Sequence, residues 1–150
     1  MNKYFGFTLA FLFLTFSLPK AEDHFGLGLV FGAPSGISAK IPVSTANSLN
    51  MILGYNLYGR KSSVTMIADY VWYQYDIIPI TVGKLPLYFG PGATANFSDG
   101  ASIGVRAVIG AEYQFATVPF DAFLELGPGI NVIPNTNGYF TIGLGARYLF

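Results

Sequence analysis

The chain has no cysteine and few charged residues. Without cysteine in its 150 residues it can form no disulfide, no thiolate metal site and no lipid-bearing cysteine of the bacterial lipoprotein kind. Charged residues make up 11% of the chain, whereas typical soluble domains contain about 25%. The formal net charge is zero and the longest basic cluster is Arg60-Lys61. Nucleic-acid binding therefore has no electrostatic footprint, and we predict no nucleic-acid partner.

Residues suited to catalysis or metal binding are also scarce. His24 is the only histidine, and no nucleophile pattern lies beside it, so a Ser–His–Asp triad is not predicted. Asp121 and Glu125 could act as an acid–base pair, but pairing with arginine is the interpretation we favour. No cluster has metal-ligand spacing. We predict no enzyme activity, no catalytic residue, no metal and no cofactor.

Long hydrophobic runs are missing from residues 22–150. A helix that crosses a bilayer needs about 20 apolar residues, and this part has no such run, although 52% of the chain is hydrophobic. The 18 glycines argue against a helical protein. A chain this apolar, without a spanning helix, fits a transmembrane barrel.

Residues 1–21 have the pattern of a secretory signal peptide. Lys3 supplies the positive charge, residues 4–18 form a short apolar stretch, and Ala21 is a small residue at a plausible cleavage point. Cleavage after Ser17 and an uncleaved anchor helix are the alternatives. We therefore expect an exported protein whose mature part, residues 22–150, is one domain.

The C-terminal stretch 139–150, YFTIGLGARYLF, shows what kind of strand the chain forms. Every second residue from Phe140 to Phe150 is apolar, and the face between them is small or polar and includes Arg147. This alternation predicts a β-strand, because successive side chains of a strand point to opposite faces. Glycine and arginine would make a poor core for a soluble sheet. In a membrane barrel they suit the lumen, while the apolar face meets lipid.

The same alternation recurs along the mature chain. It predicts an all-β fold, an eight-stranded antiparallel transmembrane β-barrel, which satisfies the backbone hydrogen bonds without water. Pro86 and Pro91 each remove a ladder donor, so we expect a bulge or a shortened fifth strand. The predicted strands cover residues 25–32, 37–43, 49–58, 64–73, 84–95, 101–114, 120–130 and 139–150.

Every charged residue well inside a predicted strand falls on the inner face. A charge facing lipid near the bilayer centre would cost roughly 2–4 kcal/mol, so this sorting favours a membrane barrel over a lipocalin-like soluble one. We predict a cluster of Arg106, Glu125 and Arg147. The lumen of an eight-stranded barrel is just wide enough for side chains to fill, which predicts a polar plug, with a narrow pore as the alternative. The predicted lumenal ionic network is Lys40, Asp69, Arg106, Glu112, Asp121, Glu125 and Arg147.

Aromatic residues gather near the strand ends. In membrane barrels such residues form girdles at the two interfaces, whereas ordinary enrichment of aromatic residues in strands is the alternative explanation. The predicted girdle at the end that holds both termini includes Tyr70, Trp72, Tyr113, Phe120, Tyr148 and Phe150. A second group near the other end includes Phe31, Tyr58, Phe97, Tyr139 and Phe140.

These features together resemble the small eight-stranded outer-membrane barrels of Gram-negative-type bacteria, the class of the OmpA membrane domain and OmpX. The ending Tyr148-x-Phe150 looks like the terminal signal that the barrel-assembly machinery reads. More narrowly, F-G-L-G-L-V-F-G-A-P-S-G-I-S, L-P-L-Y-F-G-P-G-A, F-L-E-L-G-P-G and G-L-G-A-R-Y-L-F resemble an uncharacterised family of spirochaete barrels. Outer-membrane enzymes of the same strand count carry a catalytic His or Ser–His pair, and this chain departs from that pattern.

The resemblance implies a location in the bacterial outer membrane, with outer-membrane lipid and the assembly machinery as partners. We expect a non-enzymatic barrel with a structural or surface-interaction, adhesin-like role and a plugged lumen. The alternative is a porin-like narrow channel for small solutes. If both termini are periplasmic, the surface loops lie near Pro34, Arg60, Ser98 and Thr136. These loops are short, which disfavours extended surface recognition, and the sequence names no host or surface ligand.

Overall fold

The structure is a computed structural model that describes residues 24–56, 63–98 and 100–150. The predicted signal peptide at 1–21 and the turn predicted at 59–62 lie outside the described residues. No helix within the described ranges is long and apolar enough to cross a membrane. The strands are β1 (Gly26–Ala33), β2 (Ser35–Pro42), β3 (Asn47–Asn56), β4 (Ser63–Gln74), β5 (Leu87–Phe97), β6 (Ala101–Gln114), β7 (Phe120–Ile133) and β8 (Asn137–Leu149).

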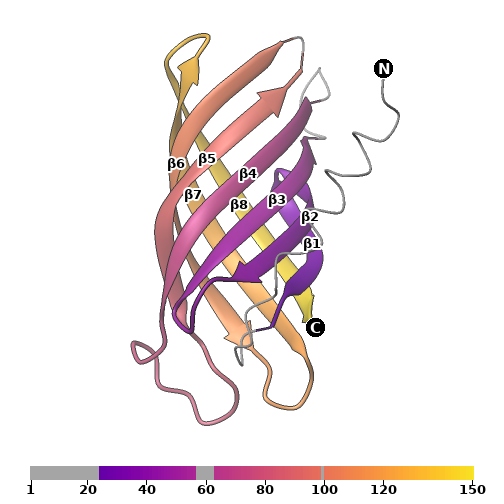
Figure 1. The fold of residues 1–150 in the computed structure, drawn as a ribbon, viewed down its shortest axis with the longest axis vertical. Coiled ribbons are helices and arrows are strands. Elements are labelled where there is room, and N and C mark those ends of the chain that lie inside the picture. The colour runs from indigo at the N-terminus through magenta and orange to yellow at the C-terminus, as the bar shows by residue number, and fades with distance from the viewer. Residues whose placement is uncertain (1–23, 57–62, 99) are drawn as a thin grey trace, which may run out of the picture.

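The eight strands form one closed sheet (Figure 1). Each strand pairs antiparallel with its sequence neighbours, and β1 pairs with β8 along a seam that runs from Gly26 opposite Leu149 to Ala33 opposite Ile142. The prediction of an all-β fold with eight antiparallel strands in a closed barrel is confirmed. Closure leaves no strand with an unpaired edge, so the backbone donors and acceptors of the sheet bond within the protein.

Both described chain ends lie at one end of the barrel, which we call the terminal end. There the Nδ1 atom of His24 lies 2.7 Å from the carbonyl oxygen of Phe150. The connections 43–46, 75–86 and 115–119 also lie at this end, which is the lower one in Figure 1. The connections at Pro34 and 134–136 lie at the opposite end, as do Ser98 and Gly100.

Two strand boundaries differ from the prediction by three residues, and the others differ by at most two. β5 begins at Leu87 rather than at residue 84, because Pro86 has no N–H group for the ladder; pairing continues beyond it only as a single bridge between Lys84 and Gln114. The β7–β8 hairpin is longer than expected and stays paired as far as Asn131 opposite Asn137. The prediction ends the strand at 130, but the exposed apolar alternation continues through Val132, and β7 runs to Ile133.

The two faces of the sheet differ in chemistry. Every strand exposes large apolar side chains on its outer face; Leu144, for example, is 60% exposed. The inner face combines a small apolar core with buried polar and charged side chains. The apolar core consists of Val30, Ile52, Ile67, Val71, Tyr73, Tyr88, Val108 and Phe123. The outer surface is thus more apolar than the interior, which is the reverse of a water-soluble barrel.

Candidate functional site

The charged side chains inside the barrel form two clusters at different depths. The structure buries all the residues of the predicted lumenal ionic network, each with 7% of its surface exposed or less. We call the group nearer the chain ends the terminal cluster and the other group the inner cluster. The terminal cluster consists of Lys40, Glu112, Asp121 and Arg147, and the inner cluster consists of Asp69, Arg106 and Glu125.

Glu112 is the centre of the terminal cluster and is fully buried. Its Oε1 atom accepts hydrogen bonds from Lys40 Nζ at 2.7 Å and from Gln114 Nε2 at 3.0 Å. Its Oε2 atom accepts from the Tyr73 hydroxyl and from Arg147 Nη2, both at 2.9 Å. One carboxylate on β6 therefore holds β2, β4 and β8 across the lumen.

Arg147 completes the terminal cluster. Its Nε atom donates to Asp121 Oδ1 at 3.0 Å, since Asp121 and Arg147 are directly opposite each other on β7 and β8. The guanidinium carbon also lies 4.3 Å from the ring centroid of Phe123, and Lys40 Nζ lies at the same distance from the Tyr73 ring. These cation–π contacts add to the ion pairs of the buried cluster. With two cations and two carboxylates, the cluster has no formal net charge.

Arg106 is the centre of the inner cluster. Two of its guanidinium nitrogens bind both oxygens of Asp69, with Nε donating to Oδ1 at 2.9 Å. Its Nη2 atom also donates to Glu125 Oε1 at 3.2 Å, and Nη1 donates to Thr141 Oγ1 at 2.6 Å. The Tyr88 hydroxyl donates to the other Glu125 oxygen at 2.9 Å. The donors of this planar guanidinium group thus join β6 to β4, β7 and β8.

Glycines on the inner face leave room for these contacts. Gly92 lies between Asp69 and Arg106 in a row across three strands, because it pairs with both of them. A Cβ atom at Gly92 would overlap the Asp69 carboxylate. Gly110 lies in the same way between Tyr88 and Glu125, and an added Cβ would be 2.6 Å from the Tyr88 hydroxyl. Because glycine has no side chain, its two neighbours in the row can contact each other in the space that a side chain would fill.

The predicted cluster of Arg106, Glu125 and Arg147 is wrong in one pairing. Arg106 does contact Glu125, but Arg147 binds Asp121 and Glu112. The reason is the β7–β8 register, which places Gly143 opposite Glu125 and Arg147 opposite Asp121. Sequence reasoning also missed the tyrosine donors of both clusters, Tyr73 and Tyr88, although the alternation places both on the inner face.

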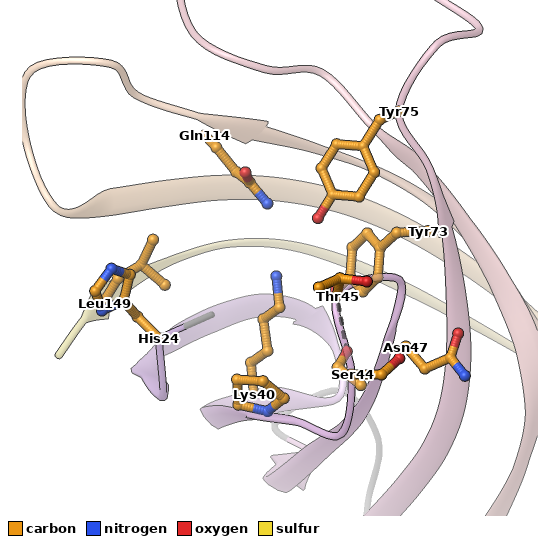
Figure 2. Close-up of a pocket in the computed structure, with 11 residues that line it drawn as sticks. His24, Lys40, Ser44, Thr45, Asn47, Tyr73, Tyr75, Gln114 and Leu149 are labelled. Atoms are coloured by element: carbon orange, nitrogen blue, oxygen red, sulfur yellow. Dashed lines mark hydrogen bonds between the residues drawn. The ribbon is translucent and has the colours of Figure 1, made fainter. Parts of the chain in front are cut away.

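The lumen contains a cavity at each end and a filled middle. The cavity at the terminal end measures about 60 Å³ and is lined by residues that include His24, Lys40, Thr45 and Gln114; Figure 2 shows the Lys40 ammonium group pointing toward Gln114. The cavity at the opposite end measures about 330 Å³, and its described lining is uncharged and mixes polar side chains with the apolar Ala33, Pro34 and Phe140. That lining includes Thr65, Thr94, Asn96, Ser102, Asn131 and Tyr139. No described residue lines both cavities, because the two ionic clusters and the apolar core lie between them.

The aromatic residues of the terminal end are in contact with one another. Tyr70 packs on Trp72 with ring centroids 5.2 Å apart, and Phe120 packs on Tyr148 at the same separation. Tyr148 also contacts Phe150 at 4.9 Å, and Tyr113 contacts Phe115 at 4.8 Å. At the opposite end Phe31, Phe97 and Phe140 are exposed. Tyr139 instead turns inward and hydrogen-bonds Thr94 at 2.8 Å, and Tyr58 lies outside the described residues.

Comparisons with protein families, with curated proteins and with solved structures find no match. The described ranges contain no group of three or more histidine or carboxylate side chains placed to hold a metal ion. The interior is thus built of ion pairs: the terminal cluster is formally neutral, the inner cluster has two carboxylates for one guanidinium group, and Asp121 Oδ2 has no hydrogen-bond partner among the described residues.

Removing the Glu112 carboxylate is expected to destabilise the barrel strongly. In Glu112→Ala, Lys40 and Arg147 lose a buried partner, and such a loss typically costs about 3–5 kcal/mol. The measurement is the free energy of unfolding in urea for the protein folded in detergent or vesicles. Asp76→Ala, which removes an exposed carboxylate, is the control. Equal stability of the two variants would show that Glu112 does not hold the strands together.

A methyl group at Gly92 should also be destabilising. It displaces the Asp69 carboxylate from Arg106, and overpacking of this kind typically costs about 1–3 kcal/mol. Gly138→Ala is the matched control, since the nearest atom to an added Cβ there is 3.9 Å away. Unfolding of both variants in the same lipid measures the difference. If Gly92→Ala is as stable as Gly138→Ala, the interior is looser than these contacts require.

Proposed function

We propose that this chain is a non-enzymatic integral barrel of the bacterial outer membrane, with a structural or surface-interaction role and a plugged lumen. The observation that supports this proposal is the inverted distribution of side chains. The charged side chains of the described strands are buried in the interior, and the described residues on the outer face of the strands include no charge. Such an arrangement is costly in water and suits a hydrocarbon solvent.

The apolar outer face is too extensive for a monomer in water. Monomeric soluble proteins rarely expose a continuous apolar patch of more than a few hundred Å². Here large apolar side chains that are more than a third exposed occur on all the strands of the barrel, among them Leu29, Leu53, Val105, Leu124 and Leu144. Lipid contact around the whole barrel accounts for this pattern better than a single protein partner, which would cover one side.

The backbone and the aromatic residues support the same proposal. A structure inside a bilayer must satisfy its backbone hydrogen bonds internally, and the closed sheet has no free edge. Aromatic side chains such as Trp72 and Tyr148 cluster on the outer face at the terminal end, where a membrane–water interface would lie. The C-terminal Tyr148-x-Phe150 is the segment we propose the barrel-assembly machinery to recognise.

The filled lumen supports a structural or surface role over transport. A channel needs a continuous water path, and the two ionic clusters occupy the cross-section between the end cavities. The recess of about 330 Å³ at the opposite end, with its mixed polar and apolar uncharged lining, is the feature that suits contact with an uncharged surface ligand. If the termini are periplasmic, this recess faces the cell exterior.

Lipid exposure of the outer face predicts a depth-dependent penalty for charge. Leu144 lies near the middle of β8 and is 60% exposed, and Leu144→Arg should cost roughly 2–4 kcal/mol when the barrel is folded in vesicles. Phe140→Arg, on the same face of β8 near the opposite end, should cost roughly 0–1 kcal/mol. Urea unfolding in lipid measures both values. An arginine tolerated equally well at the two positions would contradict a membrane-spanning outer face.

A plugged lumen predicts electrical silence. The mature protein, refolded and inserted in a planar bilayer, should show no reproducible conductance steps, because no continuous water path joins its ends. The Arg106→Ala variant is recorded alongside. Steps in the wild-type protein that change in size in this variant would show that the inner charges line a water path. The narrow-pore alternative would then replace the plug.

A further inference from the structure

The connection between β4 and β5 is the longest in the barrel and lies at the terminal end. Twelve residues, 75–86, separate the two strands, more than separate any other pair of consecutive strands. In outer-membrane barrels the turns at the periplasmic end are usually short and the longer loops are extracellular. A long connection beside both termini is therefore a feature that the barrel fold does not require.

This connection exposes aliphatic side chains. Ile77 and Val82 are 58% and 63% exposed, and Ile78 and Ile80 are each 37% exposed. Its charged residues are Asp76 and Lys84, one of each sign. Loops that face water are normally polar, so four exposed aliphatic side chains in six residues mark a surface that an apolar phase or partner covers.

Hydrogen bonds hold the connection against the outer face of the barrel. The hydroxyl of Tyr113 donates to the carbonyl of Val82 at 3.1 Å, and Gly83 turns the chain with a φ of 76°. Lys84 and Gln114 then exchange two backbone bonds, of 3.0 Å and 2.8 Å. Figure 1 shows the loop below β4 and β5, bulging sideways beyond the strands. These contacts fix residues 82–84 of the loop beside Tyr113, which packs on Phe115.

We infer that the 75–86 connection is a lipid anchor, whose aliphatic side chains enter the headgroup–acyl boundary of the leaflet at the terminal end. This inference rests on the proposed membrane location. The apolar loop is continuous with the aromatic outer face through Tyr113, so the phase that covers that face also reaches Val82. Interfacial segments of this kind bury their apolar side chains roughly 5–10 Å into the boundary. Lys84 belongs to the lumen side instead, since it pairs with Gln114 and its ammonium group lies 5.8 Å from the Tyr75 ring centroid.

Tryptophan scanning tests the anchor directly, because Trp72 is the only tryptophan. In a Trp72→Phe background, Ile77→Trp and Ile80→Trp report on the loop. Leu124→Trp reports on the outer face, and Thr45→Trp reports on an exposed turn at the same end. Each full-length mature variant is folded into phosphatidylcholine vesicles with or without bromine on the acyl chains near the headgroup. Circular dichroism checks that every variant keeps its β-structure.

The anchor predicts that Ile77→Trp and Ile80→Trp emit at short wavelength and lose most of their emission to brominated lipid. Thr45→Trp should emit at long wavelength and be quenched by acrylamide instead. If the loop tryptophans behave like Thr45→Trp while brominated lipid quenches Leu124→Trp, the anchor is wrong. The proposal of a membrane barrel is then still supported. If Leu124→Trp is not quenched either, both the anchor and the membrane location fail.

A third outcome distinguishes lipid from protein as the covering partner. In this outcome the loop tryptophans emit at short wavelength and are quenched by neither brominated lipid nor acrylamide. They become exposed to water when the protein is diluted in lipid. Such behaviour would mean that a second copy of the protein covers the loop. This result also overturns the anchor. Comparing the loop variants at low and high protein-to-lipid ratio separates the two cases.

Discussion

The fully buried carboxylate of Glu112 is the interaction on which the barrel interior most depends. It accepts hydrogen bonds from Lys40, Gln114, Tyr73 and Arg147, which come from four strands. A buried charge is tolerated only when its partners are in place, so the register of the surrounding strands is constrained by this one group. Arg106 imposes the same requirement on Asp69 and Glu125 at a different depth. The inner glycines follow from these pairings, since Gly92 and Gly110 stand where a side chain would separate the partners.

Ion pairs hold the interior of this barrel together, and most of its large apolar side chains lie on the outer face. In a soluble barrel the burial of hydrophobic side chains inside drives folding, but here the apolar core contains few residues, such as Val71, Val108 and Phe123. The proposed membrane location supplies the missing driving force, because lipid takes the place of a protein core for the outer side chains. The same reasoning links the proposed function to the lipid anchor. The proposed function places the aromatic residues of the terminal end in contact with lipid. The proposed anchor places the 75–86 connection in contact with the same lipid.

The sequence predicts the strands and their faces well, because alternation with a period of two is a local signal. It correctly places Lys40, Asp69 and Arg147 on the inner face. It predicts the contact of Arg106 with Glu125 but not the partners of Arg147, because pairing depends on how far each strand is shifted against the next, and turn geometry sets that shift. For this reason Arg147 was assigned to Glu125 rather than to Asp121. The sequence also predicts a longer connection after the fourth strand, but it begins the fifth strand at residue 84 instead of Leu87, since the alternation around Leu85 continues through a proline that interrupts the ladder.

The most direct test of the proposed membrane barrel is a nuclear magnetic resonance experiment on the methyl groups of the protein in lipid nanodiscs. Side chains of the same chemical type point in both directions; Val105 and Leu144 are exposed, while Val30, Val71 and Val108 are buried inside. The proposal predicts nuclear Overhauser contacts between lipid acyl chains and the methyl groups of Val105 and Leu144. It predicts no such contacts for the three inner valines. Acyl contacts to the inner valines, or their absence at Val105 and Leu144, would contradict the inverted barrel on which this account is built.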